Sequence, residues 1–422
     1  MEIHGSETQY GSRPQRGCQD GLYVLRSALQ TRRQHGLPTW ALFIDLVKAF
    51  DTINYKLLFI VLKHYGVPEK LVNLIEKLYT GMTINVCIGK EKSTIPYSIG
   101  VQQGDNMAPV LFIFVMLAFT DILEKNWSPT WGITPIQFKR HSPTTSYGRL
   151  IAQDPDAIGE KFDLFNLLYV DDGTFLFNLR EELEKGAQMI SNTFKLLGLT
   201  MHVGTGESKS KSEAMYISPS FKHDNSTENN TAPISLTEGT ISFCTEFKYL
   251  GSIITNDMTD ENEIIMRIKK ANMQFGALKQ IFSDNKVKLS SKFLLYKSII
   301  LNTVLWGCES WTLNVDSKRR LESFQNNIIR RILRISMHDV QHGRITNTQI
   351  KNRFYNIPSI IKIIKARQLK WLGKITLMKN DRMPKKLLAS WTNNHRKNGR
   401  PQLNIRNSYA DALSQVLLPP IK

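Results

Sequence analysis

Cysteine is scarce in this chain of 422 residues, which has only four: Cys18, Cys87, Cys244 and Cys308. They form no Cys-x-x-Cys pair and no cluster with histidine, so the sequence excludes a zinc site of the usual spacing and a disulfide framework. Long apolar runs are missing as well, because the longest, residues 110–119, has about half the length that crosses a bilayer. Nothing near the N-terminus resembles a signal peptide. We therefore expect a reducing compartment, no secretion and no membrane partner.

Acidic residues are scarce in the C-terminal part. Residues 1–263 contain 24 Lys and Arg against 30 Asp and Glu, a net charge of −6, whereas residues 264–422 contain 31 against 7, a net charge of +24. All of the basic excess is therefore C-terminal. This asymmetry indicates a catalytic part that handles metal ions, followed by a part that holds a polyanion, for which nucleic acid is the natural candidate.

Helical and β-rich segments alternate in the first half of the chain. Apolar residues show helical spacing over residues 19–35 and 56–80, with a short β-rich run at residues 39–45 between them. A second β-rich run, residues 83–89, comes before an apolar helix that begins at Pro109. Such alternation is typical of the α/β class.

Two polar segments without periodicity, residues 124–160 and 222–232, are predicted to be surface loops, and we take the first as an insertion. Residues 243–255 are predicted to form a strand or hairpin. From residue 262 the pattern is mostly helical, with apolar residues at steps of three and four and arginines between them. A single arginine there is as typical of a solvated face as of a nucleic-acid contact, and only the charge of the whole region favours nucleic acid.

An acidic pair, Asp171-Asp172, interrupts the apolar, β-forming run of residues 167–177. Two negative charges between buried arms predict the tip of a β-hairpin, at a place where a divalent cation would bind. Asp-Asp-Gly is also a common turn sequence, so the pair taken alone is equally typical of a plain hairpin loop.

A second acidic position, Asp45, ends another apolar strand. Nucleotidyl transfer uses two metal ions a few ångströms apart, one at the attacking hydroxyl and one at the triphosphate, and therefore needs carboxylates from two strands. We expect Asp45 to face Asp171 from a neighbouring strand.

At this point the chain resembles the reverse transcriptases of LINE-type (non-LTR) retrotransposons. The resemblance begins at about Gln9 and covers nearly the whole chain. The segments that carry it, in the order the family has them, are residues 43–51, 100–112, 169–172, 198–215 and 247–251. One such motif is generic, whereas several in the correct order are specific.

The resemblance implies a role for each matched polar residue. Asp45, Asp171 and Asp172 would be catalytic and would bind two Mg²⁺ ions, with Mn²⁺ as an alternative. Gln103 and Gly104 would lie against the incoming nucleotide and the template, and Gly104 would let the backbone approach the base pair closely.

Two more residues take roles from the same resemblance. Phe50, five residues after Asp45, matches an aromatic steric gate, because a ring under the sugar leaves no room for a ribose 2′-hydroxyl. Lys211 would protonate the leaving pyrophosphate as a general acid, with Lys209 as the alternative, and either could instead be a plain loop lysine. Residues 105–109, Asp-Asn-Met-Ala-Pro, depart from the Cys-Pro-Leu-Ser-Pro that the family usually has.

The implied fold is a right-hand polymerase of the α/β class with an α+β palm. The finger strands that usually precede Gln9 are missing, so we expect an N-terminally truncated element product. The predicted parts are partial fingers (1–38), palm (39–261, with the insertion at about 124–160 and a primer-grip hairpin at about 241–255), helical thumb (262–315) and a basic, mostly helical C-terminal region (316–422).

We therefore expect an RNA-directed DNA polymerase in the nucleus or cytoplasm that adds dNTPs to a DNA 3′-hydroxyl. Its partners would be an RNA template and a DNA primer or target DNA, and the sequence indicates no oligomeric state. Two alternatives stay open. One is a non-catalytic remnant whose basic C-terminal part still binds RNA or DNA. The other is a group II intron maturase, which shares the palm.

Overall fold

The computed structural model describes residues 5–102, 104–140, 159–205, 208–219, 230–392, 394 and 403–417. The chain forms two compact units. The first consists of residues 1–21, 31–245 and 389–397, and the second of residues 22–30, 246–388 and 398–422, so far as these residues are described. In these described parts, no helix combines the length and the apolar character that a membrane crossing requires.

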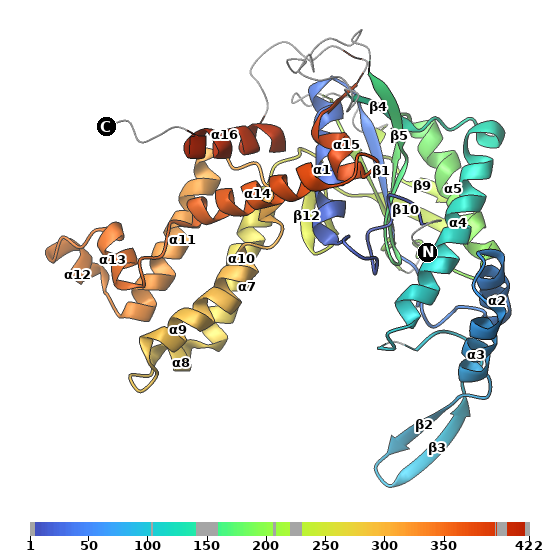
Figure 1. The fold of residues 1–422 in the computed structure, drawn as a ribbon, viewed down its shortest axis with the longest axis horizontal. Coiled ribbons are helices and arrows are strands. Elements are labelled where there is room, and N and C mark those ends of the chain that lie inside the picture. The colour runs from blue at the N-terminus through green and yellow to red at the C-terminus, as the bar shows by residue number, and fades with distance from the viewer. Residues whose placement is uncertain are drawn as a thin grey trace. The chain divides into compact units, whose positions relative to one another are not determined.

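A six-stranded sheet forms the centre of the first unit (Figure 1). In sheet order its strands are β6 (Asn166–Tyr169), β7 (Asp172–Phe177), β1 (Thr39–Ile44), β8 (Glu213–Ile217), β10 (Gly239–Phe243) and β9 (Ile234–Leu236). Every pair is antiparallel except β8 with β10. All six residues of β1 are buried, as expected of an apolar strand with a neighbour on each side.

Two helices, α4 (Ala108–Trp131) and α5 (Arg180–Leu196), pack with this sheet around an aromatic core. Phe119 of α4 stacks on Phe194 of α5 with ring centroids 4.0 Å apart, and it meets Phe175 of β7 edge-on at 6.2 Å. A third helix, α1 (Cys18–Gln34), precedes β1, and its middle residues belong to the second unit. The sheet and these helices confirm the α/β class.

The helical pattern over residues 56–80 is two helices rather than one. They are α2 (Tyr55–His64) and α3 (Glu69–Tyr79). The chain breaks between them because Gly66 adopts a left-handed backbone, with φ +76°, and Pro68 has no N–H to continue a helix. A hairpin of β2 (Thr83–Ile88) and β3 (Glu91–Pro96) follows, exposed along its whole length (Figure 1).

The prediction that residues 124–160 form a loop-like insertion is wrong in its described parts. Helix α4 continues to Trp131, and β4 (Ile136–Arg140) pairs with β5 (Glu160–Leu164) and with β13 (Ser390–Trp391). Ile136 and Phe138 are fully buried, so this sheet has a core-facing side that the Pro- and Ser-rich composition hid. Residues 141–158 lie outside the described residues, as do residues 222–229 of the second predicted loop.

Besides residues 22–30 of α1, the second unit consists of a hairpin followed by helices. The hairpin pairs β11 (Glu246–Tyr249) with β12 (Ser252–Thr255). The helices are α7 (Glu261–Ala277), α8 (Lys279–Ser283), α9 (Leu289–Leu295), the π-helix η1 (Tyr296–Leu301), α10 (Asn302–Val304), the 3₁₀-helix η2 (Cys308–Ser310), α11 (Val315–Leu333), α12 (Met337–His342), α13 (Asn347–Arg353), α14 (Ile360–Leu377), α15 (Met383–Leu388) and α16 (Ile405–Leu417).

One hydrophobic core runs through the helices of this second unit. Ile264 of α7, Leu321 of α11 and Ile364 of α14 are all fully buried in it. The predicted thumb and the start of the predicted C-terminal region are therefore packed together. The division of the chain into four functional parts stays a prediction.

Candidate active site

The acidic pair lies at the tip of the β6–β7 hairpin. Tyr169 pairs with Asp172 across the two strands, so Val170 and Asp171 form a two-residue turn. Apart from Tyr169 and Asp172, which border the turn, the residues of both arms are buried. The predicted hairpin with buried arms is confirmed.

Strand β1 brings the third carboxylate to the same edge of the sheet. Its last residue, Ile44, pairs with Gly173 of β7 in an antiparallel register. The next residue, Asp45, therefore continues alongside Asp172. Three acidic residues that are up to 127 positions apart in the sequence meet because β1 and β7 are neighbours.

Burial and the charges of neighbouring carboxylates raise the pKa of both members of the acidic pair. Burial raises the pKa of Asp171, and repulsion by Asp45 adds to the effect. Burial, and then the charges of Asp171 and Asp45, raise the pKa of Asp172 to about 6. The side chain of Asp172 is open to solvent on one side, yet the surrounding protein still disfavours its charged form. A cation bound here would relieve this repulsion.

We expect Asp172→Asn to stabilise the folded chain at neutral pH but not in acid. A pKa raised in the folded state means that the charged form is penalised on folding. The penalty is small at pH 4, close to the ordinary pKa of an aspartate, grows as the pH rises, and is complete above about pH 6. The free energy of unfolding should rise by about 1 kcal/mol at pH 7.5, a value reduced for solvent screening, and hardly at all at pH 4.

Urea denaturation of the variant and the wild type at both pH values measures this effect. Asp163→Asn is the matched control, because Asp163 is an exposed aspartate on β5 that only accepts a hydrogen bond from Gln137. An equal increase in the free energy of unfolding at pH 4 and pH 7.5 would contradict the electrostatic explanation.

The backbone of Asp45 is fixed by residues that sequence reasoning missed. Its N–H donates to the hydroxyl of Ser212 at 3.1 Å, and its carbonyl accepts from the His202 N–H at 2.8 Å and from the Ser212 hydroxyl at 3.3 Å. Ser212 is fully buried. Its one signal in the sequence is its place directly after Lys211.

Lys211 reaches the acidic cluster, whereas Lys209 does not. The Nζ of Lys211 lies 4.0 Å from Oδ2 of Asp45, and this lysine is 68% exposed. Lys209 instead pairs with Glu213 at 3.3 Å. The structure thus separates the two lysines that the sequence left as alternatives, although the role of Lys211 stays a prediction.

The segment that contains Phe50, which follows β1, contacts α4 and the loop before it. The ring of Phe50 stacks on Phe112 of α4, with centroids 4.9 Å apart. The carbonyl of Phe50 accepts from the Val101 N–H at 2.7 Å, and that of Ile53 accepts from the Gly100 N–H at 2.9 Å. The loop that carries the Gln-Gly sequence is therefore attached to the segment that follows β1.

In that Gln-Gly sequence, Gln103 lies outside the described residues. Gly104 has φ +94°, a conformation that favours glycine, and a Cβ there would meet open space. The departure at Asp105 has a structural reason, because its carboxylate accepts from the Met107 N–H at 3.0 Å at the start of α4 and from the Tyr79 hydroxyl at 3.2 Å.

The donor set at the sheet edge fits a divalent metal ion by its chemistry. Asp45, Asp171 and Asp172 offer only carboxylate oxygens, the hard ligands that Mg²⁺ and Mn²⁺ prefer. Burial, and then repulsion between the carboxylates, raises the pKa values of Asp171 and Asp172, so a bound cation would favour their charged forms. Among the described residues, no group of three or more His, Cys, Asp or Glu side chains is gathered closely enough to form a ready-made metal site.

Of the predicted primer-grip segment, residues 241–255, residues 246–255 form the β11–β12 hairpin in the second unit, whereas residues 241–243 belong to β10 in the first. The turn of the hairpin is held by two side chains: Arg267 of α7 donates to the Gly251 carbonyl, and the indole N–H of Trp306 donates to the Leu250 carbonyl at 3.3 Å. Leu250 has φ +46° and Gly251 φ +78°, so the turn needs such support. Its contact with a primer stays a prediction.

The sheet edge, the motif order and the chain's similarity to known proteins lead to one family. The family described as reverse transcriptase (RNA-dependent DNA polymerase) matches residues 3–254, and the chain belongs to it. Reverse transcriptases generally use divalent metal ions.

Curated relatives come from retrotransposons. Over 116 residues the chain is 28% identical to the Pol polyprotein of the type-2 retrotransposable element R2DM of Drosophila melanogaster, covering 27% of this chain and 11% of that protein. Over 101 residues it is 27% identical to the Pol polyprotein of the type-1 retrotransposable element R2 of Popillia japonica, covering 24% and 17%. The match thus spans less than a fifth of either relative.

Solved structures with some likeness are telomerases. One is telomerase from Candida tropicalis with a TWJ fragment of telomeric RNA, at 12% identity and a TM-score of 0.39, covering 87% of this chain and 52% of that one. The apo telomerase of the same organism has the same identity and TM-score and covers 93% and 59%.

Proposed function

We propose that this chain is an RNA-directed DNA polymerase that adds dNTPs to a DNA 3′-hydroxyl on an RNA template. The observation that carries the proposal is the meeting of Asp45 with Asp171 and Asp172 at one edge of the sheet in a member of the reverse transcriptase family. The retrotransposon origin of the curated relatives supports an RNA template and a DNA primer or target as partners.

Asp45, Asp171 and Asp172 are the residues that would hold two divalent ions, Mg²⁺ or alternatively Mn²⁺. Such ions, when bound, activate the primer hydroxyl and neutralise the triphosphate. The chain contributes rigidity: Asp45 is fixed through Ser212 and His202, and the pair is fixed at the turn of a buried hairpin. Rigid placement matters because misplacing a reacting group by about 1 Å can cost a hundredfold in rate.

Phe50 is proposed to exclude ribonucleotides. Its stacking on Phe112 holds the ring against α4, so it cannot easily give way to a 2′-hydroxyl. We expect Phe50→Val to raise the incorporation of rNTPs relative to dNTPs roughly 10- to 100-fold, the effect of removing a steric clash. The ratio of kcat/KM for a matched rNTP and dNTP measures it. Phe59→Val, which removes a half-buried ring from α2, is the control and should leave the ratio unchanged.

Primer extension tests the proposal as a whole. The purified chain is given a DNA primer on an RNA template, dNTPs and Mg²⁺, and we expect extension that stops when EDTA is added. A chain that binds this primer–template but never extends it would favour the non-catalytic nucleic-acid-binding alternative.

The nucleic-acid-binding alternative is supported by a basic surface in the second unit. On α11, Arg319, Arg320 and Arg331 are exposed, as is Arg334 at its end, and Asp316 is exposed with them. Such a surface attracts a polyanion, and binding through it should weaken steeply as salt increases. We propose that it supports the polymerase by holding nucleic acid, and not that it replaces the polymerase activity.

A further inference from the structure

Gln9 lies next to the acidic turn, although it belongs to neither of the two segments that carry the carboxylates, residues 43–51 and 169–172. Residues 8–10 lie beside β6, where Gln9 forms an isolated parallel bridge with Leu168: the Tyr10 N–H donates to the Leu168 carbonyl at 2.8 Å, and the Leu168 N–H donates to the Thr8 carbonyl at 2.9 Å. The side chain of Gln9 is 3% exposed. Its Oε1 accepts from the Val170 N–H at 3.0 Å and from the Gly11 N–H at 2.9 Å.

The turn that Gln9 contacts is strained. Val170 has φ +58°, a left-handed conformation that a β-branched residue rarely adopts. Its backbone N–H is outside the β6–β7 ladder, in which Tyr169 pairs with Asp172. Val170 is itself buried, so its N–H needs an acceptor inside the protein, and Gln9 provides one. A strained turn persists only where its surroundings hold it.

Gly11 allows this contact to be close. A Cβ at this position would lie 2.5 Å from Cγ2 of Val170 and 2.6 Å from its backbone nitrogen. Any larger residue would push the segment away from the turn. Gln9 and Gly11 therefore both pack directly against the turn at Val170.

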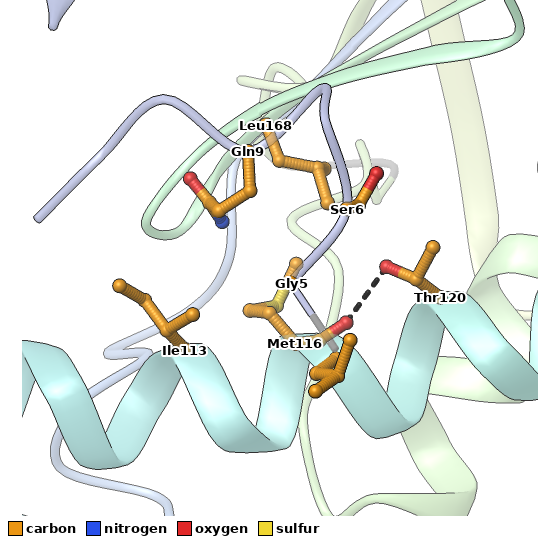
Figure 2. Close-up of a pocket in the computed structure, with 8 residues that line it drawn as sticks. Gly5, Ser6, Gln9, Ile113, Met116, Thr120 and Leu168 are labelled. Atoms are coloured by element: carbon orange, nitrogen blue, oxygen red, sulfur yellow. Dashed lines mark hydrogen bonds between the residues drawn. The ribbon is translucent and has the colours of Figure 1, made fainter. Parts of the chain in front are cut away.

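The orientation of the Gln9 amide is determined by its partners. Because its oxygen accepts from two N–H groups, the nitrogen must point elsewhere. Figure 2 shows the nitrogen on the side of α4, at a small cavity lined by Ile113, Met116 and Leu168. In the described part of the chain this Nε2 has no hydrogen-bond partner, so its oxygen alone links Gln9 to the turn.

We propose that Gln9 is a positioning residue for the acidic pair: it fixes the Val170 turn and thereby the places of the Asp171 and Asp172 carboxylates. The inference rests on the proposed function, because it assumes that these carboxylates bind the metal ions. Gln9 itself does not touch the reacting atoms. Loss of its oxygen should loosen the turn without unfolding the sheet, since the backbone bonds of residues 8–10 to Leu168 remain.

Three variants of the full chain test the proposal. Gln9→Met keeps the size of the side chain and removes the acceptor, whereas Gln9→Glu keeps an oxygen at the same reach. Thr8→Val is the matched control: it removes a buried hydrogen bond of 2.5 Å from Thr8 to Asn166 in the same segment but leaves the turn unchanged. Circular dichroism and thermal melting establish that each variant folds.

Two measurements on these variants do not depend on polymerase activity. Amide hydrogen exchange of residues 167–172 should be about tenfold faster in Gln9→Met than in wild type, the effect of one buried hydrogen bond, and close to wild type in Gln9→Glu and Thr8→Val. The Mn²⁺ affinity, measured by electron paramagnetic resonance, should fall several-fold in Gln9→Met alone.

Equal amide exchange rates of residues 167–172 in Gln9→Met and Thr8→Val would overturn the proposal. So would an unchanged Mn²⁺ affinity in a Gln9→Met chain in which these residues exchange faster than in wild type. A wild-type chain that extends no primer would contradict the proposed function instead. The exchange comparison would still decide whether Gln9 holds the turn.

Discussion

Asp171→Asn should lower RNA-templated incorporation of a nucleotide roughly 1,000-fold or more. The substitution keeps the shape of the side chain and removes the charge that would bind a divalent ion. Losing a metal ligand of this kind takes away several kcal/mol of transition-state stabilisation, and each 1.4 kcal/mol is a factor of ten in rate. The fold should remain intact, because the repulsion that raises the pKa of Asp172 is weakened in the variant.

Single-turnover incorporation of one matched dNTP measures this loss. Asp163→Asn makes the same chemical change on β5, outside the acidic cluster, and should keep the wild-type rate. If Asp171→Asn and Asp163→Asn were equally active, Asp171 would have no part in catalysis.

Lys211→Ala should slow the same step about 100-fold, in the range of general acid catalysis. The Nζ of this lysine lies 4.0 Å from Oδ2 of Asp45, and this placement supports its proposed role as the proton donor to the leaving pyrophosphate. Lys209→Ala is the matched control, because Lys209 is also exposed and pairs with Glu213. Its rate should stay within about twofold of wild type.

Lys211→Arg separates proton donation from charge. Arginine keeps the positive charge but does not release a proton at ordinary pH, so this variant should remain slow if Lys211 is a general acid. Full activity of Lys211→Arg would show that only the charge matters. Equal losses in Lys211→Ala and Lys209→Ala would reject the distinction that the structure makes between the two lysines.

Much of the site follows from patterns that are local in the sequence. The apolar run around Asp171 predicts the hairpin, because the β-forming apolar arms and the turn residues between them lie within a few positions of one another. The apolar strand that ends at Asp45 predicts β1 for the same reason. The expected meeting of the two strands required one further step, the need of two-metal chemistry for carboxylates from two strands, and the β1–β7 register confirms that the strands are neighbours. The catalytic roles stay predictions.

The parts that escaped prediction depend on contacts between distant residues. Gln9 and Val170 are 161 positions apart, and Ser212 and Asp45 are 167 apart, so no local pattern marks either pair. The burial of Phe138 in β4 depends on pairing with β5 and β13, which the polar composition around it does not reveal. Of the two lysines, only the folded chain shows that Lys211 faces Asp45.

The central claim is that the carboxylates at this sheet edge carry out templated nucleotidyl transfer. Incorporation of a single labelled dNTP by the wild-type chain, on RNA templates that differ only in the first template base, tests it most directly. We expect each template to select its complementary dNTP, with one pyrophosphate released per nucleotide added and no addition in EDTA. Binding of the same primer–template duplexes without any addition, or addition that ignores the template base, would contradict the claim.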